Sequence, residues 1–301
     1  MRLLASGKVR ELYEVRSGLL VMVASDRISA FDVVFEEEIP QKGRVLTATS
    51  AYWYQETSSI ARNSFVSADP EDVAREVGDE PWAQAHSGCA MIVQAAQMLP
   101  LECIVRSRLA GSAAAEYERN GTVHGLEMPA GLVLGDPLPE PLFTPSTKAA
   151  SGHDVNIDFR GAAELVGAQL VAQAREICLA LFEAASHQLS RAGLVLADTK
   201  FELGLLEGSL VLCDEVVTPD SSRIWAADAL HRGTPPPSFD KQPLRDWAMQ
   251  SGWDGSPPPP RLPAPVVEAT SRRYVESYER MTGRFLDDWY GPAPVTEATQ
   301  D

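Results

Sequence analysis

The N-terminal third of the chain is a series of short apolar runs separated by polar turns. Residues 7–16, GKVRELYEVR, alternate between polar and apolar positions and carry Lys8 and Arg10 on one face, which predicts a half-buried strand. Residues 19–24, LLVMVA, are continuously apolar and predict a buried strand paired with the first. Basic residues that follow a glycine can cover a phosphate, but the segment lacks the Walker spacing and a G-x-G-x-x-G pattern.

Longer amphipathic patterns predict helices. Apolar positions recur at helical spacing in residues 45–62 and in residues 161–191, where Gly193 supplies the stop. A further helical pattern covers residues 266–289, after proline runs that divide the C-terminal part into separate segments. The apolar stripe of residues 161–191 is predicted core, and we assign it no chemistry.

Residues 194–225 concentrate charged side chains beside apolar strands. Asp198, Lys200 and Glu202 are spaced by two, so they project from one face of an extended strand. A second apolar strand follows and ends at Asp214. Burying carboxylates and lysines beside apolar strands costs free energy unless they pair with one another, a metal or a ligand. The segment therefore fits either a solvated charged face of a two-stranded ribbon or a site for Mg²⁺ and a nucleotide phosphate.

Polar residues also gather in the loop SDRISAFD, residues 25–32. This loop directly follows a predicted buried strand, and loops leaving a sheet commonly carry functional side chains. Ser29 and Asp32 are its candidates. The structural alternative is an Asx-type turn with a local Asp–Arg pair.

Arg106 and Arg108 end a predicted strand just before a predicted helix, with Ser112 as its N-terminal cap. Free N–H groups at a helix start and nearby guanidinium groups favour phosphate. The alternative is a pair of surface arginines bound by nearby acids.

The Gly- and Pro-rich residues 125–160 contain the loop PSTKAASGHD, which carries Lys148, His153 and Asp154. A single loop histidine is more often structural than catalytic. The lysine beside the His-Asp pair makes this loop a candidate for function.

Composition excludes several classes of partner. The 301 residues include 26 Lys and Arg against 42 Asp and Glu, a net charge of −16, which argues against nucleic acid or an anionic membrane surface. The four cysteines are widely spaced and fit reduced thiols rather than a disulfide framework or a zinc site. Neither a signal peptide nor a membrane-spanning run is apparent, so we expect a soluble cytoplasmic protein.

Eight segments in order resemble the SAICAR synthetase family: GKVRELY, SDRISAFD, IPQKG, ECIVRSRLAGS, FTPSTKAASGHD, ADTKFELG, CDEVVTPDSSRIW and SFDKQPLRDW. They extend from residue 7 to about residue 247. The resemblance implies the ATP-dependent joining of L-aspartate to the carboxylate of carboxyaminoimidazole ribonucleotide, with release of ADP and phosphate. It implies ATP and Mg²⁺ as cofactors and a monomer or homodimer.

The resemblance also implies an α+β fold in two parts. Residues 1–100 would form a β-rich ATP-binding part. Residues 101–301 would form a larger α/β part with the substrate site and the C-terminal helices, and ATP would lie in a cleft between the two parts.

By resemblance, five residues would serve ATP and its metal. Lys8 and Arg10 would contact the ATP phosphates, while Glu202 and Asp214 would hold Mg²⁺. Lys200 would lie beside the transferred phosphate and act in catalysis.

Other residues would serve the ribonucleotide. Arg106, Ser112 and Arg223 would bind its 5′-phosphate, and Asp32 and Asp198 would orient substrate groups as catalytic residues.

The loop residues Lys148, His153 and Asp154 would lie over the reacting centre, with Lys148 catalytic and the other two binding substrate. Ser29 and Lys42, together with Lys148, are candidates for the L-aspartate pocket.

Two features depart from the family pattern: Ser107-Arg108, where many relatives carry a tyrosine or an amide, and the proline-rich C-terminal third. Alternative functions are another ATP-dependent carboxylate–amine ligase, a small-molecule kinase, or a nucleotide-binding regulatory protein. Arg106, Ser112 and Arg223 discriminate against an acceptor that lacks a phosphate.

The hairpin geometry gives a specific expectation. A two-residue turn at Glu207-Gly208 would pair Phe201 with Asp214 and put Asp214 on the face opposite Glu202. A shared metal therefore predicts an odd-length turn or a bulge, with Gly208 at positive φ.

Overall fold

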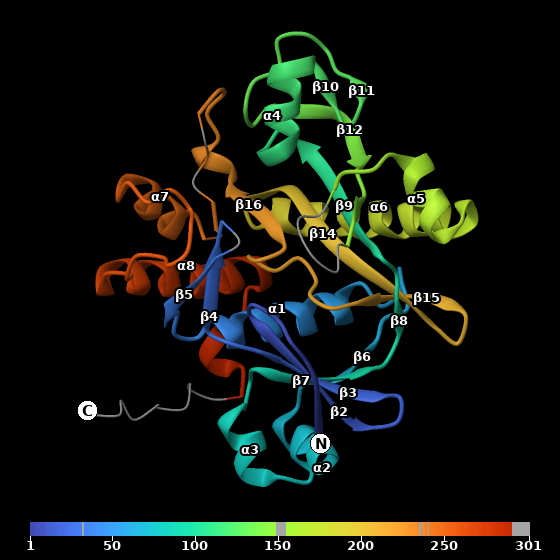
Figure 1. Cartoon of the computed structure of the whole chain (residues 1–301), viewed down its shortest axis with the longest axis vertical. Coiled ribbons are helices and arrows are strands. Elements are labelled where there is room, and N and C mark those ends of the chain that lie inside the picture. Colours follow the sequence, from blue (N-terminus) through green and yellow to red (C-terminus); the bar gives the residue numbers. More distant parts are fainter. Residues whose placement is uncertain (32, 149–154, 235, 237, 240, 291–301) are drawn as a thin grey trace. The chain divides into compact units, whose positions relative to one another are not determined.

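The computed structural model describes residues 1–31, 33–148, 155–234, 236, 238–239 and 241–290 (Figure 1). The chain divides into two compact units. The first comprises Met1–Tyr52, Phe65–Ala95 and Pro243–Asp301, and the second comprises Trp53–Ser64 and Ala96–Gln242. No helix within these described ranges is both long enough and apolar enough to span a membrane.

An antiparallel sheet forms the N-terminal part of the first unit. Its strand order is β1-β2-β3-β7-β6, with β1 Arg2–Ser6, β2 Arg10–Arg16, β3 Leu19–Ala24, β7 Ala90–Gln94 and β6 Phe65–Ser67. The predicted pairing of the first two runs is confirmed, since Arg10 lies opposite Ala24. Helices α2 (Pro70–Val77) and α3 (Glu80–Ala85) contribute Val73 and Ala83 to its core.

The rest of the first unit is a second apolar core. Strands β4 (Arg27–Ala30) and β5 (Val33–Glu38) pair with each other, and α1 (Lys42–Glu56), α7 (Gln242–Gln250), α8 (Ala264–Thr282) and the 3-10 helix η2 (Leu286–Asp288) complete the group. Their shared cluster includes Ile28, Leu46, Leu244, Tyr274 and Tyr278. The C-terminal helices thus pack in the same unit as the N-terminal strands, whereas the prediction placed them with the substrate site in the part of residues 101–301.

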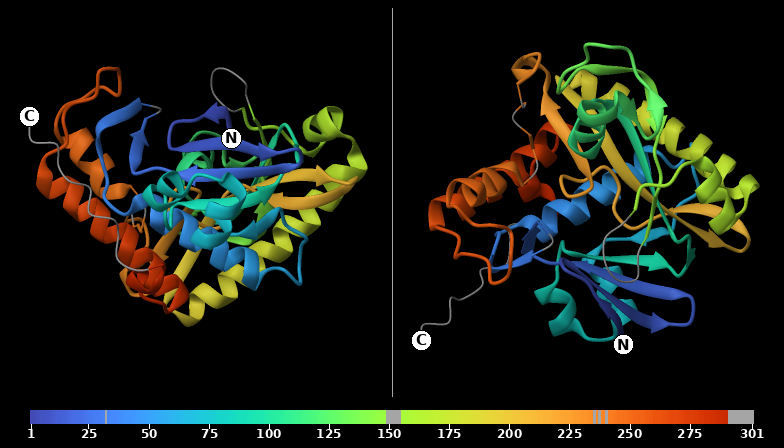
Figure 2. Two further views of the ribbon diagram at one scale, coloured as in Figure 1. Left: turned by 90° about the horizontal axis from the view of Figure 1, so that it is seen from below. Right: turned by 45° about the horizontal axis from the view of Figure 1, so that its top comes forward.

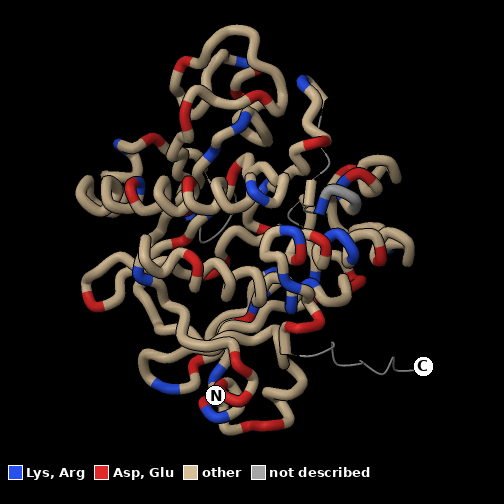
Figure 3. The backbone as a smooth tube through the Cα atoms, turned by 180° about the vertical axis from the view of Figure 1, so that it is seen from behind, with Lys and Arg blue, Asp and Glu red and all other residues tan. Residues whose placement is uncertain are grey.

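Helix α8 also carries a concentration of charge (Figure 3). Arg272 pairs with Glu268 four residues before it, and Arg273 and Arg280 both pair with Glu276. These pairs lie within one helix, so each one supports the helix only weakly.

The second unit is built on a seven-stranded sheet with the central order β12-β9-β14-β15. Its strands are β8 Gln97–Met98, β9 Leu101–Arg108, β12 Pro137–Phe143, β13 Ser146–Thr147, β14 Leu194–Leu206, β15 Ser209–Cys213 and β16 Ser222–Ala226. The edge strand β12, PLPEPLF, contains three prolines. The remaining elements are α4 Gly111–Asn120, α5 Phe159–Val166, α6 Ala168–Arg191, the hairpin β10 Thr122–Val123 with β11 Leu126–Glu127, and the 3-10 helix η1 Ala227–Ala229.

Helix α6 covers one face of this sheet, as the views of Figure 2 show. Ala174, Leu181, Ala185 and Leu189 are buried along it, which confirms the predicted core stripe. The single helix predicted over residues 161–191 is in fact two helices. Gly167 has φ +94°, outside the helical range, and it ends α5 and precedes α6.

The hairpin of β14 and β15 has a regular two-residue turn. Leu206 lies opposite Ser209 and Glu202 lies opposite Cys213, while Glu207 and Gly208 have φ +53° and +77°. The prediction of an odd-length turn or bulge is wrong, and the prediction of positive φ at Gly208 is confirmed. Two positive φ values define a type I′ turn, whose twist matches that of paired strands and therefore needs no bulge.

This turn predicts a stabilising substitution. Glu207→Asn should raise the free energy of unfolding by about 0.5 kcal/mol, because asparagine tolerates positive φ better than glutamate. The lost ion pair with Arg62 is long, at 3.9 Å, and exposed, so it contributes little. Urea unfolding of the two proteins measures the difference.

Gly208→Ala is the matched control. A Cβ at this position meets no atom within 4 Å, so the expected loss of about 1 kcal/mol comes from backbone strain alone. Equal stability of all three proteins would contradict the type I′ assignment.

Candidate functional site

A row of three charged residues crosses the centre of the second sheet. Asp198 of β14 lies opposite Arg106 of β9 on one side and opposite Arg223 of β16 on the other. Its Oδ2 atom accepts hydrogen bonds from Nη1 of Arg106 at 2.9 Å and Nη1 of Arg223 at 2.7 Å. Asp198 and Arg106 are both buried. One carboxylate thus holds two guanidinium groups side by side.

A register shift creates this row. Leu196 pairs with Ile224, but two residues later Asp198 pairs with Arg223, so β14 contains one residue more than β16 over this stretch. Without the shift, Asp198 would lie opposite Ser222. Because side chains alternate between faces, the shift brings Arg223 to the same face as Asp198.

The N-terminus of α4 lies beside the two arginines, and we call this group, Arg106, Ser112, Arg223 and the start of α4, the cradle. The helix begins at Gly111 after Ala110, and no side chain caps it. The predicted cap at Ser112 is wrong, since the Ser112 hydroxyl accepts a hydrogen bond from Nη2 of Arg106 at 3.3 Å. Gly111 has φ +54°, and a Cβ there would lie 2.5 Å from Nη2 of Arg223. Exposed helix N–H groups beside two guanidinium groups are suited to a phosphate.

A second cluster lies further along the same face of β14. Nζ of Lys200 lies 2.8 Å from Oε1 of Glu202 and 3.2 Å from Oε1 of Glu102, and Lys148 binds the other oxygen of Glu202. Glu102 belongs to β9, the strand that also carries Arg106. The pairing of β9 with β14 therefore positions both clusters.

Neighbouring carboxylates control the charge of Lys200. Burial alone would lower its pKa, but Glu202, Glu215, Asp214 and Glu102 outweigh burial and raise the pKa above its ordinary value. For Glu202 the effects are reversed. Burial would raise the pKa of its carboxyl group, but the positive charges of Lys200 and Lys148 outweigh burial and lower that pKa. Lys200 is therefore a fixed cation and Glu202 a fixed anion at neutral pH.

The donor set fits a divalent cation bound together with a phosphate ligand. Glu202 pairs with both lysines and Glu102 pairs with Lys200, and the charges of Asp214 and Glu215 also act on Lys200, so acidic groups outnumber the lysines. Mg²⁺ prefers oxygen ligands and is commonly held by one or two carboxylates plus substrate phosphates. Within the described ranges, no three metal-ligating side chains are grouped to hold an ion by themselves.

Asp214 does not follow the alternation of the hairpin. Strand β15 ends at Cys213, and Asp214 has φ +58°, while its carbonyl accepts a hydrogen bond from the hydroxyl of Tyr54 at 2.6 Å. The regular turn removes the geometric argument for a metal shared by Glu202 and Asp214. That assignment stays a prediction.

The first unit contains another group of predicted residues. Lys8 lies in the turn before β2, Arg10 begins β2, Ser29 lies in β4, and Lys42 begins α1 with its side chain buried near the ring of Tyr274. Their predicted roles stay predictions.

Asp32, His153 and Asp154 lie outside the described residues. In the second unit, the structure brings Arg106, Ser112, Asp198 and Arg223 together, and separately brings Lys148, Lys200 and Glu202 together.

Several residues that contact these clusters were not predicted from the sequence. Thr144 accepts a hydrogen bond from Arg106, Ser146 donates one to Glu102, and Glu215 accepts one from Thr218. The spacing of two between Thr144, Ser146 and Lys148 was the available signal, because it places all three on one side of an extended segment.

Glu116 of α4 connects the helix to the β10–β11 hairpin that follows it. Its carboxylate accepts hydrogen bonds from the Thr122 hydroxyl at 2.8 Å and from the backbone N–H groups of His124 and Gly125 at 3.0 and 2.8 Å. Burial alone would raise the pKa of Glu116, but these hydrogen bonds outweigh it and lower the pKa below its ordinary value.

A pH-dependent contribution to stability follows. A group whose pKa is depressed by folding stabilises the native state above its ordinary pKa, and this contribution is lost as pH falls through the folded pKa. The stability difference between the wild type and Glu116→Gln should therefore be large at neutral pH and shrink below about pH 4.5. Urea unfolding across this range measures it.

Glu118→Gln is the control, because Glu118 is exposed on the same helix. If the stability difference between the wild type and Glu116→Gln stayed constant with pH, the charge of Glu116 would not contribute to stability.

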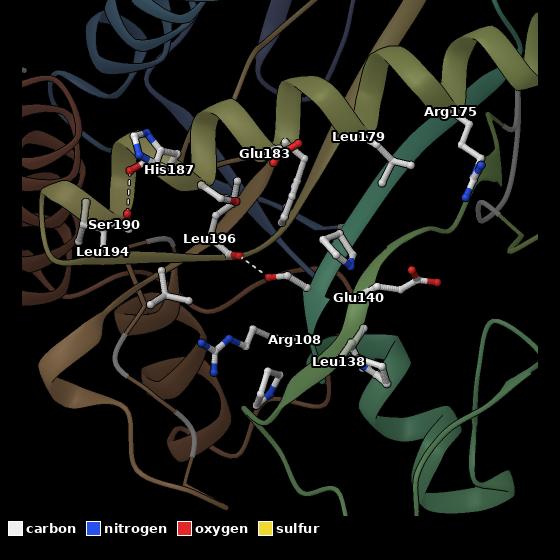
Figure 4. A pocket seen from close by; sticks show the side chains of 17 residues that line it. Arg108, Leu138, Glu140, Arg175, Leu179, Glu183, His187, Ser190, Leu194 and Leu196 are labelled. Carbon is white, nitrogen blue, oxygen red and sulfur yellow. Dashed lines mark hydrogen bonds between the residues drawn. The ribbon is translucent and has the colours of Figure 1, made fainter.

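A separate cavity of about 780 Å³ lies between α6 and β12 (Figure 4). Leu179, Glu183 and His187 of α6 line one side and Arg108 and Glu140 line the other. The residues that line this cavity include none of the two clusters described above, so the cavity is not part of the candidate site.

Comparison with known proteins identifies the family. The fold and the two clusters define an α+β protein with a buried arginine–aspartate cluster at a helix N-terminus and an adjacent lysine–carboxylate group. The family model for SAICAR synthetase matches residues 3–260. The chain belongs to the SAICAR synthetase family.

Close relatives extend over nearly the whole chain. The phosphoribosylaminoimidazole-succinocarboxamide synthase of Saccharopolyspora erythraea is 48% identical over 296 residues, covering 96% of this chain and 97% of the relative. The corresponding enzyme of Syntrophobacter fumaroxidans is 45% identical over 288 residues, covering 95% of each.

Solved structures agree on the fold. SAICAR synthase from Saccharomyces cerevisiae, complexed with SAICAR, has a TM-score of 0.87 at 40% identity and covers 94% of this chain and 95% of its own. A SAICAR synthetase in complex with ADP has a TM-score of 0.69 at 24% identity, covers 94% of this chain and 99% of its own, and supports the fold alone.

Proposed function

We propose that this chain joins L-aspartate to the carboxylate of carboxyaminoimidazole ribonucleotide, using ATP and forming SAICAR, ADP and phosphate in purine biosynthesis. Family membership and near-complete coverage of relatives with that activity in their names support the proposal. The observation that carries it is the arrangement on β14. Asp198 holds the two arginines of the cradle, and Lys200 and Glu202 follow it on the same face.

The chemistry needs positioning and charge rather than a protein nucleophile. A carboxylate is a poor electrophile, so ATP first transfers its terminal phosphoryl group to a carboxylate oxygen and ADP leaves. The amine of L-aspartate then attacks the acyl phosphate, phosphate departs, and the amine loses a proton. Phosphoryl transfer depends mainly on alignment and on neutralising the phosphate oxygens.

The lysine–carboxylate cluster fits the phosphoryl-transfer step. Lys200 remains protonated because its pKa is raised, so it supplies a fixed positive charge beside the transferred group. Glu202 and Asp214 would hold Mg²⁺, which neutralises phosphate oxygens when bound. Lys8 and Arg10 would contact the ATP phosphates.

The cradle fits the 5′-phosphate of the ribonucleotide. Arg106, Ser112 and Arg223 would bind it together with the N–H groups that begin α4. Asp198 keeps both guanidinium groups in place and would orient the substrate.

The remaining catalytic and substrate contacts are those of the sequence analysis. The substrates would also be contacted by Asp32, Ser29, Lys148, His153 and Asp154. Of these, Lys148 pairs with Glu202 in the second unit.

A kinase or a ligase with a different acceptor would use the lysine–carboxylate cluster equally well. It would not need the cradle of Arg106, Ser112 and Arg223 unless its acceptor carried a phosphate. The cradle therefore favours the ribonucleotide as acceptor.

A coupled assay tests the activity. Phosphate release from ATP and Mg²⁺ should require both carboxyaminoimidazole ribonucleotide and L-aspartate, and EDTA should abolish it. Glu202→Gln should reduce turnover on the order of 100-fold, because it removes the anion that pairs with both lysines. Circular dichroism checks that the variant remains folded. Release that is independent of either substrate would refute the ligase, and near-normal turnover of Glu202→Gln would remove Glu202 from the reaction.

Gly111→Ala tests the cradle. The added Cβ would overlap the Arg223 guanidinium, so the KM for the ribonucleotide should rise on the order of tenfold while the KM for ATP stays close to wild type. Gly121→Ala is the control: Gly121 ends the same helix with φ +72°, and a Cβ there meets nothing within 4 Å. An unchanged ribonucleotide KM in Gly111→Ala, or equal changes in the two variants, would contradict the assignment.

A further inference from the structure

The segment of residues 144–148 lies along β9 and contacts both charged clusters. The backbone N–H of Thr144 donates to the carbonyl of Ile104 at 2.8 Å, and Ser146 pairs directly with Glu102. Thr144, Ser146 and Lys148 are spaced by two and contact three different charged side chains. The segment therefore touches the cradle at one end and the lysine–carboxylate cluster at the other.

Thr144 fixes the plane of the Arg106 guanidinium group. Its Oγ1 accepts a hydrogen bond from Nε of Arg106 at 3.1 Å, while Nη1 binds Asp198 and Nη2 binds Ser112. The Thr144 side chain is 1% exposed, and its hydroxyl can donate to the carbonyl of Ile104 at 3.3 Å. All three nitrogens of this guanidinium group are held, so Arg106 is preorganised before any ligand binds.

Ser146 fixes the carboxylate of Glu102. The hydroxyl of Ser146 donates to Oε2 at 3.2 Å, and Oε1 lies 3.2 Å from Nζ of Lys200. Ser146 is buried, at 2% exposed, so the donor side of this hydrogen bond is shielded from water. The serine thereby orients an acid that pairs with Lys200 and helps to set its position.

We propose that Thr144 and Ser146 are positioning residues that act on different substrates of the reaction. Thr144 holds Arg106 for the phosphate of the ribonucleotide, and Ser146 holds Glu102 and through it Lys200 for phosphoryl transfer from ATP. This inference rests on the proposed function. It adds two residues that act through other side chains. Thr144 should affect the KM for the ribonucleotide, and Ser146 should affect kcat.

The test uses isosteric and conservative variants. Thr144→Val removes the hydroxyl at constant shape and should raise the KM for the ribonucleotide on the order of tenfold, with kcat and the KM for ATP near wild type. Thr144→Ser keeps the hydroxyl and should restore the KM. Ser146→Ala should instead lower kcat on the order of tenfold, with the ribonucleotide KM near wild type, and Ser146→Thr should recover kcat.

Thr199→Val is the matched control. Thr199 is also 1% exposed and lies on β14, but its hydroxyl contacts Ser222 at 2.7 Å rather than either cluster. It should lose stability without changing either KM. Identical kinetic profiles for Thr144→Val and Ser146→Ala, or profiles that match Thr199→Val, would overturn the proposal.

Arg106→Ala separates this proposal from the proposed function. If it raises the ribonucleotide KM while Thr144→Val does not, the positioning role of Thr144 is refuted and the cradle stands. If Arg106→Ala leaves that KM unchanged, the cradle itself is misassigned and the positioning role of Thr144 falls with it.

Discussion

A carboxylate buried between two guanidinium groups is the interaction on which the site in the second unit depends. The negative charge of Asp198 reduces the repulsion between Arg106 and Arg223. The hydrogen bonds from the two arginines in turn offset the free-energy cost of removing the carboxylate from water. Removing the acid would leave two cations close together in a largely buried place. The register shift between β14 and β16 is needed because the strands would otherwise bring Ser222 to this position.

The sequence was informative where local pattern and ordered motifs determine the outcome. The first strand pair, the core stripe of α6 and the shared face of Asp198, Lys200 and Glu202 all follow from periodicity, and the ordered motifs identified the family. Local rules failed where backbone conformation at one residue decides the result. Gly167 divides a predicted helix, and two positive φ values at Glu207 and Gly208 make a regular turn where a bulge was expected.

Pairing between segments far apart in the chain also could not be predicted from the sequence. That Thr144 and Ser146 lie against β9 depends on register between segments about 40 residues apart, which alternation within one strand does not reveal. The packing of α8 with β4 and β5 joins segments still further apart in the chain. The helical pattern of α8 predicted an apolar face, but it contained no information on which surface that face would cover.

The edge strand β12 has a consequence for the behaviour of the protein at high concentration. Three of its seven residues, Pro137, Pro139 and Pro141, have no N–H group, so an incoming strand would find a broken row of donors. An edge strand presents unpaired N–H and C=O groups, to which a strand of another molecule can add. The prolines therefore make this edge of the sheet a poor template for the addition of a strand from another molecule.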